Sequence, residues 1–408
     1  MSRLETAGYD ELGLRNMPPL SARRHPPDLP PMLSNLVQFG NATLKEPFVG
    51  ITTDGMPRRG LFPLGPTGVS TAPIVEAAHG FLASLDDAQR DAVTFPVDAD
   101  EWRTWCNVHI YLWRHGLLLE DLTAARRATA LELVRASLSA RGFGDVRDVM
   151  RVNEVLREIT GSDDQYGEWM FFLSIFGTPS TTGPWGWQLD GHHLNLHCFV
   201  LGDQMVLTPA FLGAEPCHVV SGSHAGLRVF DAEERRGLGV VRSLSAEQAG
   251  RAILFPSILS TDLPPARTVP IDGQMMACAF QDNRRMEYEG LRADAMTDGQ
   301  RALLRDLVET YVGRLHDGHA EIRMDEVVRH LDETHFSWMG GTDDLSPFYY
   351  KVQSPVILIE FDHEPGVVFA NNEPTRHHVH TIVRTPNGND SGADLLRQHY
   401  EQSPHHQR

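Results

Sequence analysis

Apolar residues recur at helical spacing through much of the first part of the chain. Residues 72–85 show this spacing, and the segment 102–109 places Trp102, Trp105, Cys106 and His109 at positions i, i+3, i+4 and i+7. Residues 122–142 are amphipathic and end at Gly142, a residue type suited to follow a helix C-terminus. These patterns predict a helical region over about residues 71–160, in which His109 is a packed residue.

A second helical region is predicted over about residues 245–335. Ser245 and Thr297 each stand three residues before a Gln, which is the capping-box pattern that satisfies free N–H groups at a helix start. A short closing helix is expected near the C-terminus, with Ser391 and Asp394 as its capping box.

Strand-like patterns occupy two separate stretches, about 165–230 and 345–400. Gly202 and Asp203 lie between two apolar runs of the first stretch and predict a β-hairpin there. Helices before and between strand-rich stretches favour an α+β fold, with a mixed or antiparallel sheet at its core. We expect residues 1–35, rich in Pro and Arg, to form a poorly ordered or surface-wrapping arm, and residues 36–408 a single large domain.

The composition narrows the class of protein. The formal net charge is −18, which argues against nucleic acid or an anionic membrane as the main partner. No stretch of 18 apolar residues and no secretory signal pattern are found, so we expect a cytoplasmic protein. The four cysteines have no CxxC spacing, and the simplest expectation is that they are reduced.

Several common catalytic motifs are absent from the sequence. It has no P-loop, no GxGxxG after a strand, no GxSxG and no HExxH. His330 and Asp332 imitate part of an iron-binding triad, but in a helix residues two apart point in different directions. We therefore do not expect a metal site at these two residues.

Two histidine-rich strands stand out instead, "GHHLNLHCFVL" from Gly191 and "RHHVHTIVR" from Arg376. Side chains alternate between faces along a strand, so His378 and His380 share one face. The same alternation puts His193 and His197 on one face of the first strand. Because buried imidazoles without partners are costly, this concentration favours a metal or polar catalytic site.

We expect His193, His378 and His380 to bind one metal ion. The strand around 355–362 is predicted to pair with 376–384. That pairing would bring the carboxylates of Glu360 and Asp362, on one face, beside the cluster as ligands or as acceptors for a ring N–H, with Glu360 as the first choice. His197 lies deeper in the apolar run and is expected to be a packed histidine.

The chain resembles the bacterial family called domain of unknown function 3500. The resemblance lies in "FGTPSTTGPWGWQLDGHHL", "TPAFLGAEP", "SPFYYKVQSPVILIEFD" and "HVHTIVRTPNGNDSGADLLRQHY", and it covers most of the chain from about residue 75. Trp187, Arg384, Asp390 and Gly392 match the family pattern together with Gly191–Leu194 and the His-x-His. Position 197 departs from it, since Asn is more usual there. The family implies no settled activity.

The leading hypothesis is a metalloenzyme that acts on a small-molecule substrate. The metal is zinc, iron or copper, since neutral imidazoles suit all three, and the reaction is hydrolysis or metal-dependent oxidation. His192, Glu360 and Arg384 are the candidate catalytic residues. Arg384 could also clamp an anionic group of the substrate, or form a structural ion pair with Asp390 or Asp362. Trp187 could line the substrate pocket or simply pack in the core.

Two other hypotheses stay open at this point. The same residues could hold a metal or a small ligand without catalysis, as in storage or sensing. A metal-free enzyme with His193 as general base is also possible. The oligomeric state cannot be deduced from the sequence.

Overall fold

The computed structural model describes residues 31–402 except 109–111, 270–271 and 370. The α-helices are α2 (Pro31–Thr43), α3 (Ala72–Ser84), α4 (Asp87–Val93), α5 (Ala124–Ser137), α6 (Ala140–Thr160), α7 (Asp231–Ser243), α8 (Ala246–Ala252), α9 (Asp298–Val312), α10 (Asp317–Arg329) and α11 (Ala393–Gln402). The strands are β1 (Thr94–Phe95), β2 (Leu117–Leu118), β3 (Phe171–Gly177), β4 (Pro184–Gly191), β5 (Leu194–Leu201), β6 (Gln204–Ala214), β7 (Ile253–Phe255), β8 (Leu291–Arg292), β9 (His335–Gly340), β10 (Phe348–Gln353), β11 (Leu358–Pro365) and β12 (Pro374–Arg384).

All of these strands belong to one mixed sheet, so the predicted α+β fold is confirmed. The main order is β1-β3-β4-β5-β6-β12-β11-β10-β9-β7, and β2 and β8 pair with β3 and β9. Two antiparallel meanders, β3–β6 and β9–β12, meet in the middle where β6 pairs with β12. Among the strands of the described residues, parallel pairing is confined to the margins, between β1 and β3 and between β7 and β9. Segments far apart in the sequence therefore become neighbours at the centre of the sheet.

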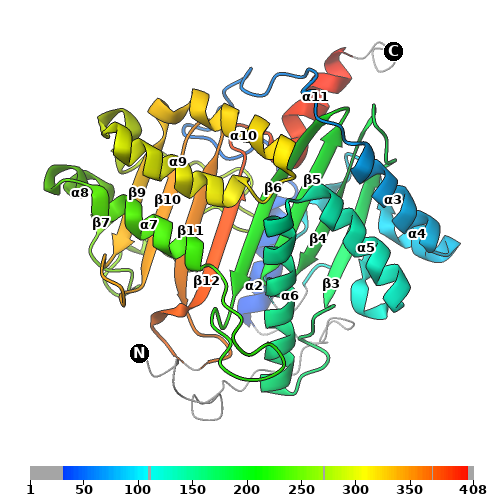
Figure 1. The fold of residues 1–408 in the computed structure, drawn as a ribbon, viewed down its shortest axis with the longest axis horizontal. Coiled ribbons are helices and arrows are strands. Elements are labelled where there is room, and N and C mark those ends of the chain that lie inside the picture. Colours follow the sequence, from blue (N-terminus) through cyan, green and yellow to red (C-terminus); the bar gives the residue numbers. More distant parts are fainter. Residues whose placement is uncertain (1–30, 109–111, 270–271, 370, 403–408) are drawn as a thin grey trace.

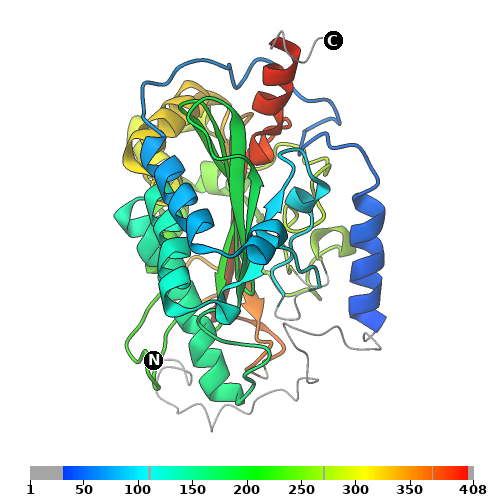
Figure 2. The ribbon, with the colours of Figure 1, turned by 90° about the vertical axis from the view of Figure 1, so that its right-hand side faces the viewer.

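The two faces of the sheet differ in chemistry. Helices α3, α5, α6, α7, α9 and α10 cover one face (Figure 1), where alternate residues such as Leu194, Leu196 and Cys198 join the main apolar core. The edge-on view shows α2 on the opposite side of the sheet (Figure 2). That opposite face carries many buried polar side chains, among them Gln188, Asp190, Asn195, His197, Lys351, Gln353, Glu360, Asp362, His380 and Arg384. Buried polar groups on this scale need fixed partners, so this face is where chemistry is to be sought.

The predicted hairpin and capping boxes are confirmed. Gly202 and Asp203 form the two-residue connection between β5 and β6, with Gly202 at φ 62°. Ser245 caps α8 and Thr297 caps α9, and each makes the reciprocal bonds of a capping box with the Gln three residues later.

The predicted ends of the early helices are wrong in two places. The amphipathic stretch is two helices, because α5 ends at Ser137 and the Ser139 hydroxyl accepts a hydrogen bond from the Gly142 backbone N–H at the start of α6. A side chain on Gly142 would lie 2.2 Å from the Arg314 carbonyl oxygen, so close packing explains the glycine. The stretch after Trp102 is not an α-helix either: only Asp100–Arg103 form a 3-10 turn.

Tertiary contacts account for this irregular stretch. Trp102 stacks on Phe176 at 3.9 Å between ring centroids, and Trp105 meets the edge of His197 at 5.8 Å. Both tryptophans thus pack toward the sheet. His109 lies outside the described residues.

The chain ends depart from expectation in two respects. Residues 1–30 lie outside the described part, and the last five residues of the predicted arm begin α2. Ser391 does not cap α11. Its φ is 50°, it lies in a 3-10 turn (Asp390–Gly392) before that helix, and its hydroxyl bonds to His197.

All four cysteines are buried and form no disulfide. Within the described ranges, no helix has the length and apolar character needed to cross a bilayer.

Candidate metal centre

Three neighbouring strands bring the predicted histidine ligands together. Leu194 of β5 lies opposite Leu212 of β6, and Gly213 of β6 lies opposite His380 of β12. His193, directly before Leu194, is therefore held beside Gly213, whose N–H donates to the His193 carbonyl oxygen at 2.8 Å. The sheet register alone thus places His193 and His380 on either side of one glycine.

The lack of a side chain at Gly213 allows the two rings to approach. A Cβ atom at this position would lie 2.9 Å from Cδ2 of His380 and 3.3 Å from Cδ2 of His193. The first distance is shorter than real carbon contacts allow. Gly213 in β6 is therefore needed for the rings of His193 and His380 to come this close.

His193 itself does not lie in a strand, which corrects the expectation that it shares a strand face with His197. It occupies the second position of the two-residue turn between β4 and β5, at φ 60°. Its backbone N–H donates to the Asn107 carbonyl oxygen at 3.2 Å. The turn aims the ring toward β12, where His378 and His380 share one face as predicted.

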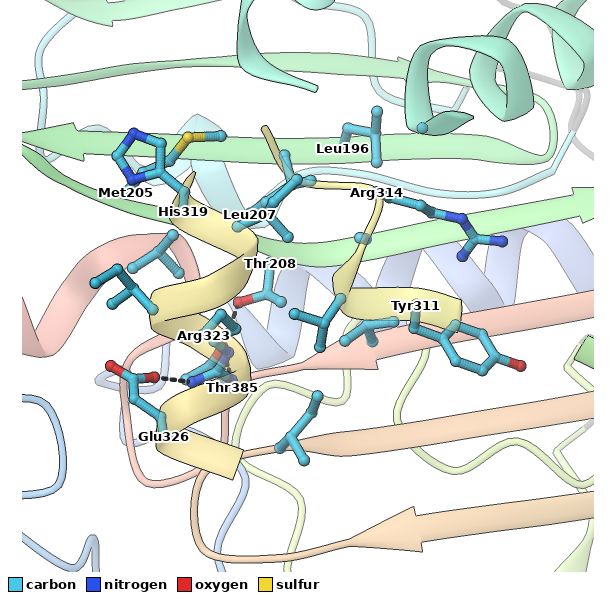
Figure 3. Close-up of a pocket in the computed structure, with 18 of the residues that line it drawn as sticks. Leu196, Met205, Leu207, Thr208, Tyr311, Arg314, His319, Arg323, Glu326 and Thr385 are labelled. Atoms are coloured by element: carbon cyan, nitrogen blue, oxygen red, sulfur yellow. Dashed lines mark hydrogen bonds and ion pairs between the residues drawn. The ribbon is translucent and has the colours of Figure 1, made fainter. Parts of the chain in front are cut away.

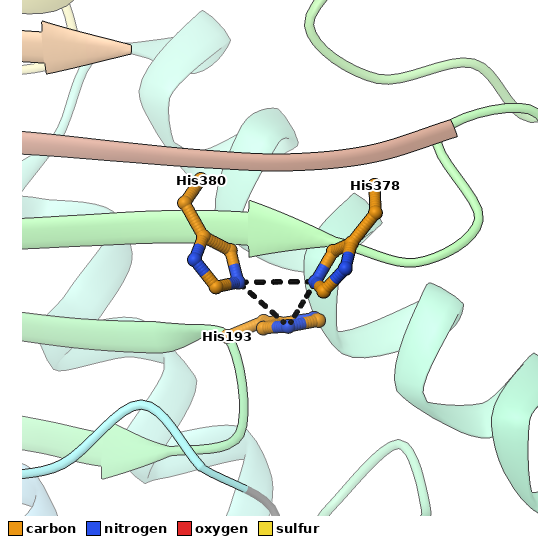
Figure 4. Close-up of side chains that lie close together, drawn as sticks. All are labelled: His193, His378 and His380. Carbon is orange, nitrogen blue, oxygen red and sulfur yellow. Dashed lines mark hydrogen bonds between the residues drawn. The ribbon is translucent and has the colours of Figure 1, made fainter. Parts of the chain in front are cut away.

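The three Nε2 atoms form a small triangle (Figure 4). The separations are 3.1 Å between His378 and His380 and 3.2 Å from each of them to His193. An ion at the usual zinc–nitrogen distance of about 2.0–2.1 Å would subtend N–metal–N angles of about 100°, close to tetrahedral. These three side chains could hold a metal ion, and they are buried, with 3–6% of each residue exposed.

A hydrogen bond behind the His378 ring orients its Nε2 atom inward. The Nδ1 atom of His378 lies 2.7 Å from the Pro365 carbonyl oxygen, which can only accept, so Nδ1 carries the proton and Nε2 has a free lone pair. The Nδ1 atom of His380 lies 3.5 Å from Oε1 of Glu364, an ion-pair distance longer than an ordinary hydrogen bond. Burial lowers the pKa of His378, which favours the neutral ring that a metal requires.

His192, a predicted catalytic residue, lies directly against the cluster. Its ring stacks on that of His193 with 3.9 Å between centroids, and its Nδ1 lies 2.9 Å from Oδ1 of Asn153 in α6. The side chain thus supports the plane of a ligand ring from behind. It is not a member of the three-nitrogen triangle.

Carboxylates gather beside His380. Burial and the neighbouring Glu364 charge raise the pKa of Asp362 well above its usual range. Burial works against ionisation of Glu364 too, but its place beside His380 lowers its pKa. Burial raises the pKa of Asp272 to about 7. Gly273 packs directly on the Asp362 and Glu364 carboxylates, where a Cβ would lie 2.5–2.6 Å from their oxygens. The surroundings of the imidazoles are therefore acidic.

The predicted place of Glu360 beside the histidines is wrong. Strand β11 does pair with β12 as expected, but Asp362 lies opposite His380 and Glu360 lies opposite Ile382. The Glu360 carboxylate accepts the Tyr349 hydroxyl at 2.6 Å and the backbone N–H groups of Met276 and Ala277. The carboxylate at the ring is that of Glu364, four residues further along the same strand. Strand alternation puts Glu364 on the side of Glu360 and Asp362, but the register of β11 against β12 decides which carboxylate meets the ring.

The substrate roles predicted for Trp187 and Arg384 are not supported by their positions. Trp187 points to the helix-covered face, where its indole N–H donates to the Ser137 hydroxyl at 3.0 Å. The Arg384 guanidinium is fully buried and bonds to Asp390 and Asp282 at 2.7 and 2.8 Å, and to two carbonyl oxygens. An arginine held in this way is a structural ion pair and has little capacity to clamp a substrate.

His197 is a packed histidine, as expected. Its nitrogens bond to the Gln188 amide at 3.0 Å and the Ser391 hydroxyl at 3.1 Å, and burial lowers its pKa well below the usual value. The pair His330 and Asp332 is also no metal site, because His330 bonds to Glu333 and Asp332 forms an ion pair with an arginine.

Buried oxygen atoms near the imidazoles lack hydrogen-bond partners. Within the described ranges these include Oδ1 of Asn107, Asp190 and Asn195. Asn107 contacts the site through its carbonyl, while Asp190 and Asn195 lie opposite each other in the β4–β5 pair. The Asn107 amide nitrogen donates to Asp272, so its oxygen is an acceptor. Such atoms call for a water or a ligand that donates hydrogen bonds.

A separate cavity of about 60 Å³ lies on the helix-covered side of the sheet (Figure 3). Its lining is mainly apolar, with Leu196, Leu207 and Tyr311 among the walls. Burial lowers the pKa of His319 at its edge to about 4, so this ring is neutral at physiological pH. With room for about two waters, the cavity offers no place for the chemistry of the histidines.

Comparison with known proteins identifies the family of the chain, but the description of that family names no activity. The family model described as "Protein of unknown function (DUF3500)" matches residues 67–393. No curated protein and no solved structure matches the chain. The geometry of the centre therefore has to supply the functional argument.

Proposed function

Since the chain belongs to the DUF3500 family, whose description assigns no activity, we propose from the site itself that it is a metalloenzyme acting on a small molecule. His193, His378 and His380 are the ligands of one divalent ion. Zinc, iron and copper all suit three neutral imidazoles. Three protein ligands leave at least one coordination position open for water, dioxygen or substrate.

The observation that carries this proposal is the triangle of Nε2 atoms at 3.1–3.2 Å. Three hydrogen bonds cannot satisfy such a triangle when each ring holds its proton on the outer nitrogen, because only lone pairs then face one another. Unshared lone pairs packed together in a buried site are destabilising. A cation between them turns this repulsion into three bonds.

The charge around the triangle also favours a cation. Glu364 lies behind His380, and the electrostatic field of Glu215 acts on His378. Among the described residues, the polar ring contacts of His378 and His380 are to histidines, a carbonyl oxygen and a carboxylate. An anionic occupant would meet this negative field, whereas a divalent cation is stabilised by it.

The chain's own residues have distinct tasks in this proposal. Pro365 and Glu364 hold the outer nitrogens of two ligand rings, and His192 supports the third ring. When bound, the ion supplies Lewis-acid or redox chemistry at its open position. The unpaired oxygens of Asn107 and Asn195 receive hydrogen bonds from hydroxyl or amide groups of the substrate. Hydrolysis and metal-dependent oxidation both fit this arrangement.

A second candidate is metal binding without catalysis. It is favoured by one observation, the 3–6% exposure of the three rings, which is low for groups that must receive a substrate. In either case, the four unpaired cysteines agree with our proposal of a reducing, cytoplasmic location.

Elemental analysis of the purified full chain tests the metal centre. We expect one divalent ion per chain, and none in a His193→Gly variant, in which glycine tolerates the φ of 60°. Absence of metal after reconstitution with zinc, iron and copper would contradict the centre. If metal is present, a screen for hydrolytic and oxidative turnover that compares the loaded and chelated protein separates enzyme from storage protein.

A further inference from the structure

A second and larger cavity lies on the polar side of the sheet, away from the imidazoles. Its volume is about 610 Å³, and it is lined by residues 44–48, by most of residues 97–105 and by one side of α11 along its length. Its floor lies near His197 and Arg384, each four residues along the chain from a proposed metal ligand. Four residues of strand span roughly 13 Å. The cavity is therefore a separate site, and its size is typical of small-molecule pockets.

The walls of this cavity are apolar and rich in aromatic rings. Phe48, Trp102, Trp105, Leu396 and Tyr400 are among the lining residues. Trp102 is anchored from behind by stacking on Phe176, and Trp105 by an edge-to-face contact with His197. Rigid aromatic walls bind flat or apolar bodies at little entropic cost, and their faces attract cations.

The floor of the cavity offers no free positive charge. The Arg384 guanidinium beneath it is neutralised by Asp282 and Asp390, and Arg103 donates to Asp282 at 3.0 Å. Ser391 lies on the floor at φ 50°, an uncommon conformation for a residue with a side chain. Strained residues concentrate at functional sites, which marks the floor as a place of interest.

The rim of the cavity is acidic. Glu46, Asp98 and Asp100 are exposed there, and over the described ranges none of their carboxylates takes part in an ion pair. Arg397 on the same rim is already paired with Asp394 and an adjacent glutamate. The positive charge of Lys45, which also lines the cavity, offsets the charge of one of these three carboxylates. A ligand that enters this cavity thus passes through a negative field.

We propose that this cavity binds an organic ammonium ion with an aromatic or apolar body. The body fills the aromatic walls, and the charged nitrogen stays at the rim beside Asp98 and Asp100. The aromatic faces and the acidic rim both attract a positive charge. Charge complementarity therefore makes the cavity prefer a cation over a neutral or anionic ligand of the same size. The site does not depend on the metal centre.

Three probes of one size and different charge test the proposal on the full-length protein: benzylammonium, benzyl alcohol and benzoate. Calorimetric titration at low ionic strength should show one site for benzylammonium. Benzyl alcohol should bind at least about fivefold more weakly, and benzoate more weakly still. Added salt should weaken only the binding of the cation. Equal binding of the alcohol, or no saturable binding of the cation, would overturn the proposal.

Variants locate the effect at the cavity. The double variant Asp98→Asn with Asp100→Asn should weaken benzylammonium binding by about three- to tenfold. The pair Asp163→Asn with Asp164→Asn changes the net charge equally in the loop after α6 and should leave the affinity unchanged. Leu396→Trp should fill the cavity and abolish binding. If both aspartate pairs have the same effect, attraction is diffuse and the site is not the one proposed.

Discussion

Replacing Glu364 by Gln is the sharpest test of how the histidine centre is held. The change removes a buried negative charge 3.5 Å from Nδ1 of His380 and keeps the side chain's size. The ring would still pack against Phe211 at 5.1 Å between centroids, so the fold should persist. The expected consequence is weaker binding of the divalent ion at the opposite nitrogen.

The magnitude follows from the positions of the charges. A dication about 2.05 Å from Nε2 would lie roughly 7 Å from the Glu364 oxygen, and at an effective dielectric constant of about 20 their attraction is about 5 kcal/mol. This is an upper bound, because the Glu364 charge helps to raise the pKa of Asp362. Once Glu364 is neutral, Asp362 ionises more readily and restores part of the field. We therefore expect a 10- to 100-fold loss of affinity, as for other carboxylates behind a ligand histidine.

Competition with a chromophoric chelator measures this affinity, using zinc or cobalt. Glu360→Gln is the matched control, because it makes the same change on the same face of β11 at a carboxylate bonded to Tyr349. That variant should keep metal affinity within about threefold and lose stability instead, since a buried charged acceptor is removed. The reasoning is refuted if Glu364→Gln binds metal like the unmodified chain, or if Glu360→Gln loses as much.

Three further outcomes are expected. His193→Gly should abolish metal binding, whereas His197→Asn should retain the metal and lower the free energy of unfolding by about 1–3 kcal/mol; metal content and denaturant titration distinguish them. Gly213→Ala should lower metal affinity at least tenfold, because its Cβ would collide with a ligand ring; wild-type affinity would show that the strand can yield. Burial acts to raise the pKa of Glu289, but hydrogen bonds from Arg267 and a lysine outweigh it and lower that pKa to about 2. A lowered carboxyl pKa stabilises the fold above its unfolded value of about 4.5, so this stability, about 1 kcal/mol for a partly exposed and screened pair, should disappear as pH falls from about 4.5 to 2. In the Glu289→Gln variant the midpoint of thermal unfolding should fall less steeply over the same pH range. A pH profile identical to that of the unmodified chain would contradict the ion pair.

The local patterns of the sequence determined much of this protein. Capping boxes located the starts of α8 and α9, and the Gly-Asp turn located the hairpin between β5 and β6, because these signals act within a few residues. The two-residue period of a strand put His378 and His380 on one face. The position of His197 deep in an apolar run identified it as part of the packed interior. These conclusions needed no knowledge of which strands are neighbours.

Other conclusions required the tertiary structure. The triangle depends on β6 pairing with β12, which brings His193 to His380 across Gly213 from 187 residues away in sequence. The same register, not the strand pattern, selects Glu364 in place of Glu360 as the carboxylate at the ring. No local period encodes which strand becomes a neighbour or how far it slides, because those are settled by the burial of whole faces.

Two candidate substrate-binding residues show the same difference between sequence and tertiary structure. Trp187 and Arg384 both lie in motifs that match the family, yet Trp187 packs under the helices and Arg384 is paired with two aspartates. The sequence determined which residue types were available for chemistry and which shared a strand face. Only the pairing of distant strands and the covering of each face decided which of them meet, since a side chain's role depends on neighbours that the chain brings in from afar.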